Sequence, residues 1–76
     1  MTKTAASSIQ VIDRVAALLD VLARSPEAQT LKLLAAETGL HPSTTYRILD
    51  ALATHGLVER TDTSQYRLGV KLLRLG

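Results

Sequence analysis

Apolar residues recur every three or four positions between Ile9 and Arg24, and this spacing predicts an amphipathic helix over that range. Ser7 and Gln10 have the spacing of a capping box at its start. On a helical wheel the apolar stripe covers about half of the circumference, which is wider than one core requires. Val11 and Leu18 lie on its flank. We therefore expect this helix to cover a second surface, either on a dimer partner or on another domain.

Two further helices are predicted on either side of a glycine turn. Thr30 is placed to cap a helix over residues 31–38, and Gly39 ends it because glycine readily takes the left-handed conformation that follows a helix. Proline is well suited to the first position of a helix, so Pro42 opens a third helix over residues 42–55. Gly56 then ends this helix as Gly39 ends the previous one.

After Gly56 the apolar residues alternate, which predicts a β-hairpin over residues 57–68 with a polar tip at 61–64. Three helices followed by a hairpin is the order of a winged helix-turn-helix. The predicted fold is thus mainly α with a small β-hairpin: a three-helix core, a wing and the start of a linker helix. The predicted divisions are a disordered leader (1–8), the winged helix-turn-helix domain (9–68) and the start of the linker helix (69–76).

Composition limits the classes of function. The chain has 76 residues and no cysteine, which excludes two separate cores, disulfide scaffolds, cysteine zinc sites and thiol nucleophiles. Two histidines alone do not build a metal site, and we expect no cofactor. No apolar run approaches the ~18 residues of a membrane span, so we expect a soluble, cytoplasmic protein without membrane partners. The net charge is +2, and the whole excess lies after residue 42, a weak indication of a polyanionic partner.

The outward face of the helix over 42–55 carries the candidate DNA-binding chemistry. Its planar guanidinium makes Arg47 the best candidate for reading guanine, and Asp50 is placed to hold that side chain. Alternatively, Arg47 and Asp50 form a surface ion pair. Thr45 points inward, and we assign it to the core. The DNA-binding candidates on this helix are Ser43, Thr44, Tyr46 and Arg47.

Each neighbour of Arg47 also has a structural alternative. Ser43 and Thr44 can bond phosphate or base edges, or they can satisfy free N–H groups at the helix start. The Tyr46 hydroxyl can reach a phosphate, or its ring can pack against the wing. In the wing, a polar tip flanked by arginines suits a narrow minor groove, although a plain solvated hairpin is the alternative. The wing candidates are Arg60, Gln65 and Arg67.

Three segments together resemble the DNA-binding domain of IclR-family bacterial transcription regulators: SIQVIDRV at 8–15, GLHPSTTYRIL at 39–49 and YRLG at 66–69. The resemblance implies a homodimer or dimer of dimers on a palindromic promoter site in double-stranded DNA. It also implies a dimer contact through the first helix and the linker helix, for which the candidates on the first helix are Val11, Val15 and Leu18. Family members usually continue into a C-terminal domain that binds a small-molecule effector, so the chain resembles an N-terminal fragment without that domain.

Two functions of other classes compete with DNA binding. A winged helix can act as a protein–protein interaction module, and the neutral charge of residues 1–42 is compatible with that function. Catalysis would need His41 or His55 as the base and a nearby hydroxyl as nucleophile. The spacing of the carboxylates predicts no triad, so we predict no catalytic residues.

Overall fold

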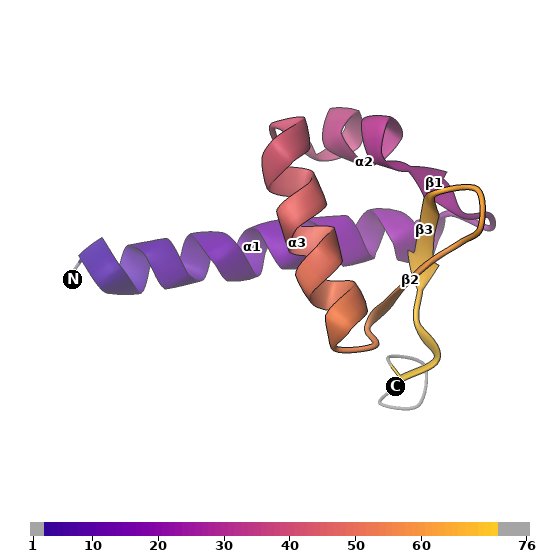
Figure 1. Ribbon diagram of the computed structural model, residues 1–76. Helices are drawn as coiled ribbons and strands as arrows, with labels where there is room; N and C mark the ends of the chain where they lie inside the picture. Colours follow the sequence, from indigo (N-terminus) through magenta and orange to yellow (C-terminus); the bar gives the residue numbers. More distant parts are fainter. Residues whose placement is uncertain (1–2, 72–76) are drawn as a thin grey trace.

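The computed structural model describes residues 3–71 of the chain (Figure 1). Within that range the sequence forms, in order, α1 (Lys3–Arg24), β1 (Gln29–Thr30), α2 (Leu31–Thr38), α3 (Pro42–Thr54), β2 (Val58–Arg60) and β3 (Gln65–Leu68). The strands form an antiparallel sheet in the order β1-β3-β2. The predicted winged helix-turn-helix fold is confirmed.

Helix α1 begins at Lys3, so the predicted start at Ile9 is wrong, and positions 3–8 belong to the helix and not to a disordered leader. The segment between Lys3 and Ile9 contains no glycine or proline and includes two alanines, which favour helix. Ser7 and Gln10 therefore lie inside α1 and do not cap its start. At the other end the chain is helical at Val70 and Lys71, and the remainder of the predicted linker helix lies outside the described residues.

Strand β1 is an element that the sequence pattern did not predict. Gln29 pairs with Tyr66 and Thr30 with Gln65, which makes β3 the central strand. Two residues are too few to show an alternating pattern, and this segment reads as a connector. Thr30 also caps α2 as predicted, since its side chain accepts a hydrogen bond from the Leu33 N–H over 3.1 Å.

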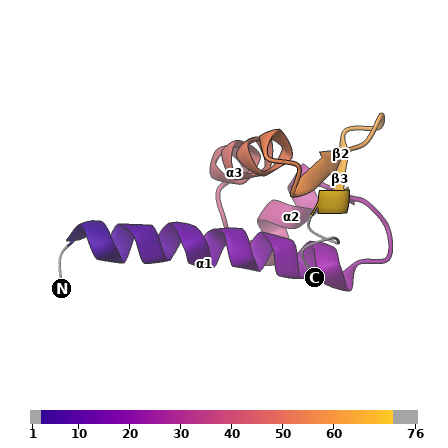
Figure 2. The same ribbon diagram turned by 90° about the horizontal axis from the view of Figure 1, so that it is seen from below.

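The hydrophobic core lies between the C-terminal half of α1, the two shorter helices and the sheet (Figure 2). It is formed by Leu18, Val21, Leu22, Leu34, Leu49, Leu52, Val58 and Tyr66. Leu18 is fully buried in its own chain, so its predicted role in a dimer contact is wrong. The helical wheel showed a wide apolar stripe but not which edge of it faces the domain. Val15 is partly buried against the same core, whereas Val11 is 52% exposed.

The turn between α2 and α3 follows the predicted chemistry. Gly39 takes the left-handed conformation with φ +74°, and its N–H donates to the Ala35 carbonyl over 2.9 Å. Pro42 occupies the first turn of α3. After α3, Gly56 has φ +76°, in agreement with its predicted role as a helix stop. The turn at Gly39 therefore sets the direction in which α3 leaves α2.

None of the helices within residues 3–71 has the length and apolar character needed to cross a membrane. In the same part of the chain, no three His, Cys, Asp or Glu side chains gather where they could hold a metal ion.

Candidate nucleic-acid interface

Helix α3 and the loop between β2 and β3 lie on the same side of the molecule, opposite α1 (Figure 2). The inner face of α3 is anchored by buried Thr45, Leu49 and Leu52. Because helical side chains recur every 3.6 residues, this anchoring turns a polar face away from the core. The exposed polar residues of that face are Ser43, Tyr46, Arg47, Asp50 and Thr54.

The start of α3 is capped by His41, a residue that sequence reasoning did not assign to this role. Its Nδ1 accepts a hydrogen bond from the Ser43 N–H over 3.2 Å and lies 2.8 Å from the Ser43 hydroxyl. Histidine is not among the preferred capping residues, so propensity gave no signal for it. The alternative in which the side chains of Ser43 and Thr44 satisfy the N–H groups at the helix start does not form. Thr44 is half-buried, while the Ser43 side chain is exposed next to His41.

Most N–H groups in the first turn of α3 already have partners. Pro42 has no N–H, the Ser43 N–H donates to His41, and the Thr45 N–H donates to the His41 carbonyl over 2.9 Å. This leaves little unsatisfied backbone to attract a phosphate by itself. An anion at this end of α3 would therefore depend on side chains more than the sequence suggested.

Arg47 and Asp50 do not pair. Among residues 10–71 the ion pairs are Arg24 with Asp20 and Arg67 with Glu59, so the expected contact that would hold Arg47 does not form. Both side chains are exposed on the outward face of α3. The guanidinium of Arg47 therefore extends into solvent with all of its donors available to a ligand.

Tyr46 and Thr45 illustrate the two sides of α3. Tyr46 is 43% exposed, and no hydrogen bond from its hydroxyl occurs within the described residues. Thr45 is fully buried, as expected from the helical wheel, and its hydroxyl donates to the His41 carbonyl over 3.0 Å. Thr45 thus belongs to the core and not to the outward surface.

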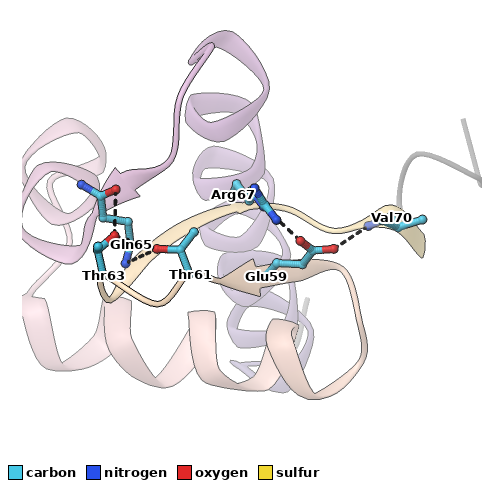
Figure 3. Close-up of polar contacts among 6 residues, drawn as sticks. All are labelled: Glu59, Thr61, Thr63, Gln65, Arg67 and Val70. Carbon is cyan, nitrogen blue, oxygen red and sulfur yellow. Dashed lines mark hydrogen bonds and ion pairs between the residues drawn. The ribbon is translucent and has the colours of Figure 1, made fainter.

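The tip of the wing is a turn closed by its own threonines (Figure 3). The Thr61 N–H donates to the Gln65 carbonyl over 2.8 Å, and the Gln65 N–H donates to the Thr61 hydroxyl over 3.1 Å. Because Thr61 and Gln65 are bonded to each other, the loop between them consists of residues 62–64. Ser64 takes a left-handed conformation with φ +60°, as the last residue of a three-residue hairpin loop commonly does. The Gln65 Oε1 accepts from the Thr63 hydroxyl over 3.4 Å. Gln65 therefore stabilises the tip through its hydrogen bonds to Thr61 and Thr63.

The three wing candidates do not share one face of the sheet. Glu59 lies opposite Arg67, and Arg60 lies opposite Tyr66, which is buried. Residues opposite each other across two strands project to the same face, while neighbours in a strand project to opposite faces. Arg67 and Gln65 thus lie on the outer face, whereas Arg60 emerges at the edge of the face that covers the core. The Arg67 Nε donates to Glu59 over 3.0 Å (Figure 3).

An open, mainly apolar groove of about 560 Å³ lies beside α2. Its lining residues are Leu31, Lys32, Ala35, Ala36, Gly39, Leu40 and Pro42. Lys32 is its one titratable side chain, so the groove offers no acid–base pair. The contact between His41 and Ser43 is exposed and serves as a helix cap.

Comparison with known protein families shows to which family the chain belongs. The IclR helix-turn-helix domain matches residues 11–62, which is most of the chain. The chain belongs to the IclR family. The match spans most of α1, the helix-turn-helix of α2 and α3, and the first part of the wing, so the resemblance to the IclR family is confirmed.

The curated relatives of the chain are named as regulators. The chain is 42% identical over 72 residues to the glycerol operon regulatory protein of Streptomyces coelicolor, covering 93% of this chain and 28% of that protein. It is 40% identical over 73 residues to an HTH-type transcriptional regulator of Mycobacterium tuberculosis, covering 95% of this chain and 28% of that protein. The chain thus spans little more than a quarter of the length of these relatives.

Solved structures of other bacterial proteins share the fold. An IclR homolog of Microbacterium hydrocarbonoxydans, crystallised with 4-hydroxybenzoate, superposes with a TM-score of 0.80 at 29% identity, over 87% of this chain and 28% of that one. HmgR of Pseudomonas aeruginosa superposes with a TM-score of 0.78 at 32% identity, over 86% of this chain and 27% of that one.

Proposed function

We propose that the chain is a sequence-specific, double-stranded DNA-binding domain of a bacterial transcriptional regulator that acts in the cytoplasm. The observation that carries the proposal is the exposed polar face of α3, on the same side of the molecule as the wing (Figure 2). An α-helix fits the major groove of B-DNA, and the residues on the outward face of α3 are exposed. The family's regulators of transcription support the same function.

In this arrangement Arg47 reads bases. Its exposed, unpaired guanidinium suits the O6 and N7 acceptors of guanine, a pairing that discriminates by roughly 1–3 kcal/mol. Ser43 and Tyr46 expose hydroxyl groups to neighbouring phosphates or base edges, and half-buried Thr44 lies at the margin of the contact. Asp50 is unpaired on the same face and is a candidate acceptor for the amino group of cytosine.

The wing adds contacts that position the domain. Arg67 and Gln65 on the outer face approach the minor groove or the phosphate backbone, and Arg60 does so from the opposite face. Phosphate contacts fix register and orientation but carry little sequence information. We therefore assign discrimination between sequences to α3. The wing contributes mainly to the affinity for duplex DNA of any sequence.

Two copies of the chain are proposed to associate through α1 and to bind a palindromic DNA site together. The N-terminal half of α1 extends away from the rest of the domain (Figure 1). Val11 and Ile12 are 52% and 65% exposed there, and Val15 adjoins them at the edge of the core. Exposed apolar residues gathered on a protruding helix are typical of a contact between subunits. In the longer relatives, a small-molecule effector would act through the remainder of the protein.

Salt dependence of binding tests the proposal against the alternative of a protein-interaction module. We expect affinity for a duplex selected from randomised DNA to fall steeply with salt, with a log–log slope of roughly −0.9 for each phosphate contacted. Binding that does not depend on salt, or no duplex binding at all, would contradict the proposal.

A further inference from the structure

The carboxylate of Glu59 holds two groups that lie in different parts of the chain (Figure 3). Its Oε1 accepts from the Arg67 Nε over 3.0 Å, and its Oε2 accepts from the Val70 backbone N–H over 3.4 Å. Arg67 belongs to the wing, whereas Val70 begins the helical residues that leave the sheet. One carboxylate thus connects the candidate DNA-binding arginine to the exit of the domain.

The geometry of the pair leaves Arg67 able to bind a further ligand. Among residues 10–71 the guanidinium is engaged through Nε alone, and its two terminal nitrogen atoms have no partner there. The Arg67 side chain is 62% exposed, against 35% for Glu59. Because a guanidinium is planar, a bond at Nε restrains the plane and so limits the directions in which the terminal nitrogens point. A phosphate can bind there without displacing Glu59.

The exit of the sheet is held firmly beside this pair. The Gly69 N–H donates to the Leu57 carbonyl over 2.8 Å, and a Cβ at position 69 would overlap the carbonyl oxygen of Gly56. Gly69 therefore packs directly against the backbone that joins α3 to β2. This contact keeps the Val70 N–H within reach of Glu59.

We propose that Glu59 is a positioning residue for DNA binding, which orients Arg67 toward the phosphate backbone and ties that orientation to the segment beginning at Val70. The inference rests on the proposed DNA-binding function. Restraining a long side chain before binding lowers the entropy lost when it meets its ligand. An exposed ion pair adds little to folding stability, so the effect of Glu59 falls mainly on binding.

A double-mutant cycle separates positioning from charge. Binding to a fluorescent mixed-sequence duplex of about 30 base pairs, some three helical turns, is measured at several salt concentrations. Arg67→Gln is combined with Glu59→Gln, with Glu59→Asp, and with Asp62→Asn as the matched control. Asp62→Asn removes one exposed negative charge from the same hairpin, while Glu59→Asp keeps the charge and shortens its reach.

We expect Arg67→Gln to weaken binding by roughly fivefold, and to reduce the salt slope by roughly 0.9, in the unmodified chain and in the Asp62→Asn background. In both Glu59 backgrounds the loss should fall below roughly twofold, because Arg67 is no longer oriented there. An equal loss in every background, or a larger loss without Glu59, overturns the positioning role alone. Absence of duplex binding by the unmodified chain overturns the DNA-binding function and this role with it.

Amide hydrogen exchange tests the connection to Val70 without any DNA. Glu59→Gln should accelerate exchange of the Val70 N–H several-fold while Asp62→Asn leaves it unchanged, and both variants should keep the melting temperature of the unmodified chain. Equal Val70 exchange in the three proteins overturns the connection between the wing and the exit of the domain.

Discussion

The buried hydroxyl of Thr45 donates to the carbonyl oxygen of His41 over 3.0 Å, and the Thr45 backbone N–H donates to the same oxygen over 2.9 Å. These two bonds fasten the first turn of α3 to the residue that caps it. A buried hydroxyl without a partner would be costly, but here it is satisfied one turn away. The start of the candidate recognition helix is thus fixed from inside the domain.

Thr45→Val tests whether this residue serves only the core. The His41 carbonyl would keep the backbone N–H as a donor, and valine fills nearly the same volume. We expect the free energy of unfolding to change by no more than about 1 kcal/mol. Affinity for duplex DNA should stay within roughly twofold of the unmodified chain. A large loss of affinity in a folded variant would instead place Thr45 at the DNA.

Leu18 and Ile12 should differ sharply in their contribution to stability. Leu18 is fully buried at the centre of the core, so Leu18→Ala should cost about 2–5 kcal/mol in urea unfolding. Ile12 is 65% exposed, and Ile12→Ala should change stability by less than about 0.5 kcal/mol. Similar costs for the two variants would contradict the described packing of α1.

Self-association should depend on the protruding half of α1. A charge at an exposed apolar contact is unfavourable once a partner buries it, so Val11→Asp should shift the chain toward monomer in sedimentation. The matched control is Gln10→Asp, which adds the same charge at an exposed polar position. The proposed contact is contradicted if both variants associate as the unmodified chain does.

The order of elements was predictable from sequence because several residues have one dominant structural use. Gly39 and Gly56 both take positive φ, and Pro42 opens α3. Thr30 accepts the capping hydrogen bond expected of it. Turn and capping residues act over four or five positions, so their effect can be read without knowing the tertiary structure.

Features that depend on distant contacts were not predictable. Strand β1 exists because Gln29 and Thr30 pair with β3, a strand far away in the sequence. Which edge of α1 faces the core depends on where α2 and β3 pack, and so Leu18 was misplaced. Arg67 forms an ion pair with Glu59 because the hairpin register places the two residues opposite each other. In the candidate interface, the sequence therefore identified candidate residues but not the residues that they contact in the folded chain.

Gly69 and Gly39 should respond differently to a methyl group. At Gly39 nothing lies within 4 Å of a Cβ, so Gly39→Ala should cost only the strain of a left-handed backbone, about 1 kcal/mol. At Gly69 a Cβ meets backbone atoms of Gly56 and Leu57 that cannot move freely. We expect Gly69→Ala to cost more, roughly 2–3 kcal/mol in thermal or urea unfolding. Equal costs would contradict the close packing at the exit of the sheet.

The central claim is that the outward face of α3 reads DNA sequence through Arg47. The most direct test compares Arg47→Ala with the unmodified chain on two duplexes, one selected by the chain from randomised DNA and one of scrambled sequence. The claim predicts a loss on the selected duplex of about 1–3 kcal/mol beyond any loss on the scrambled one. Equal losses on the two duplexes would contradict it.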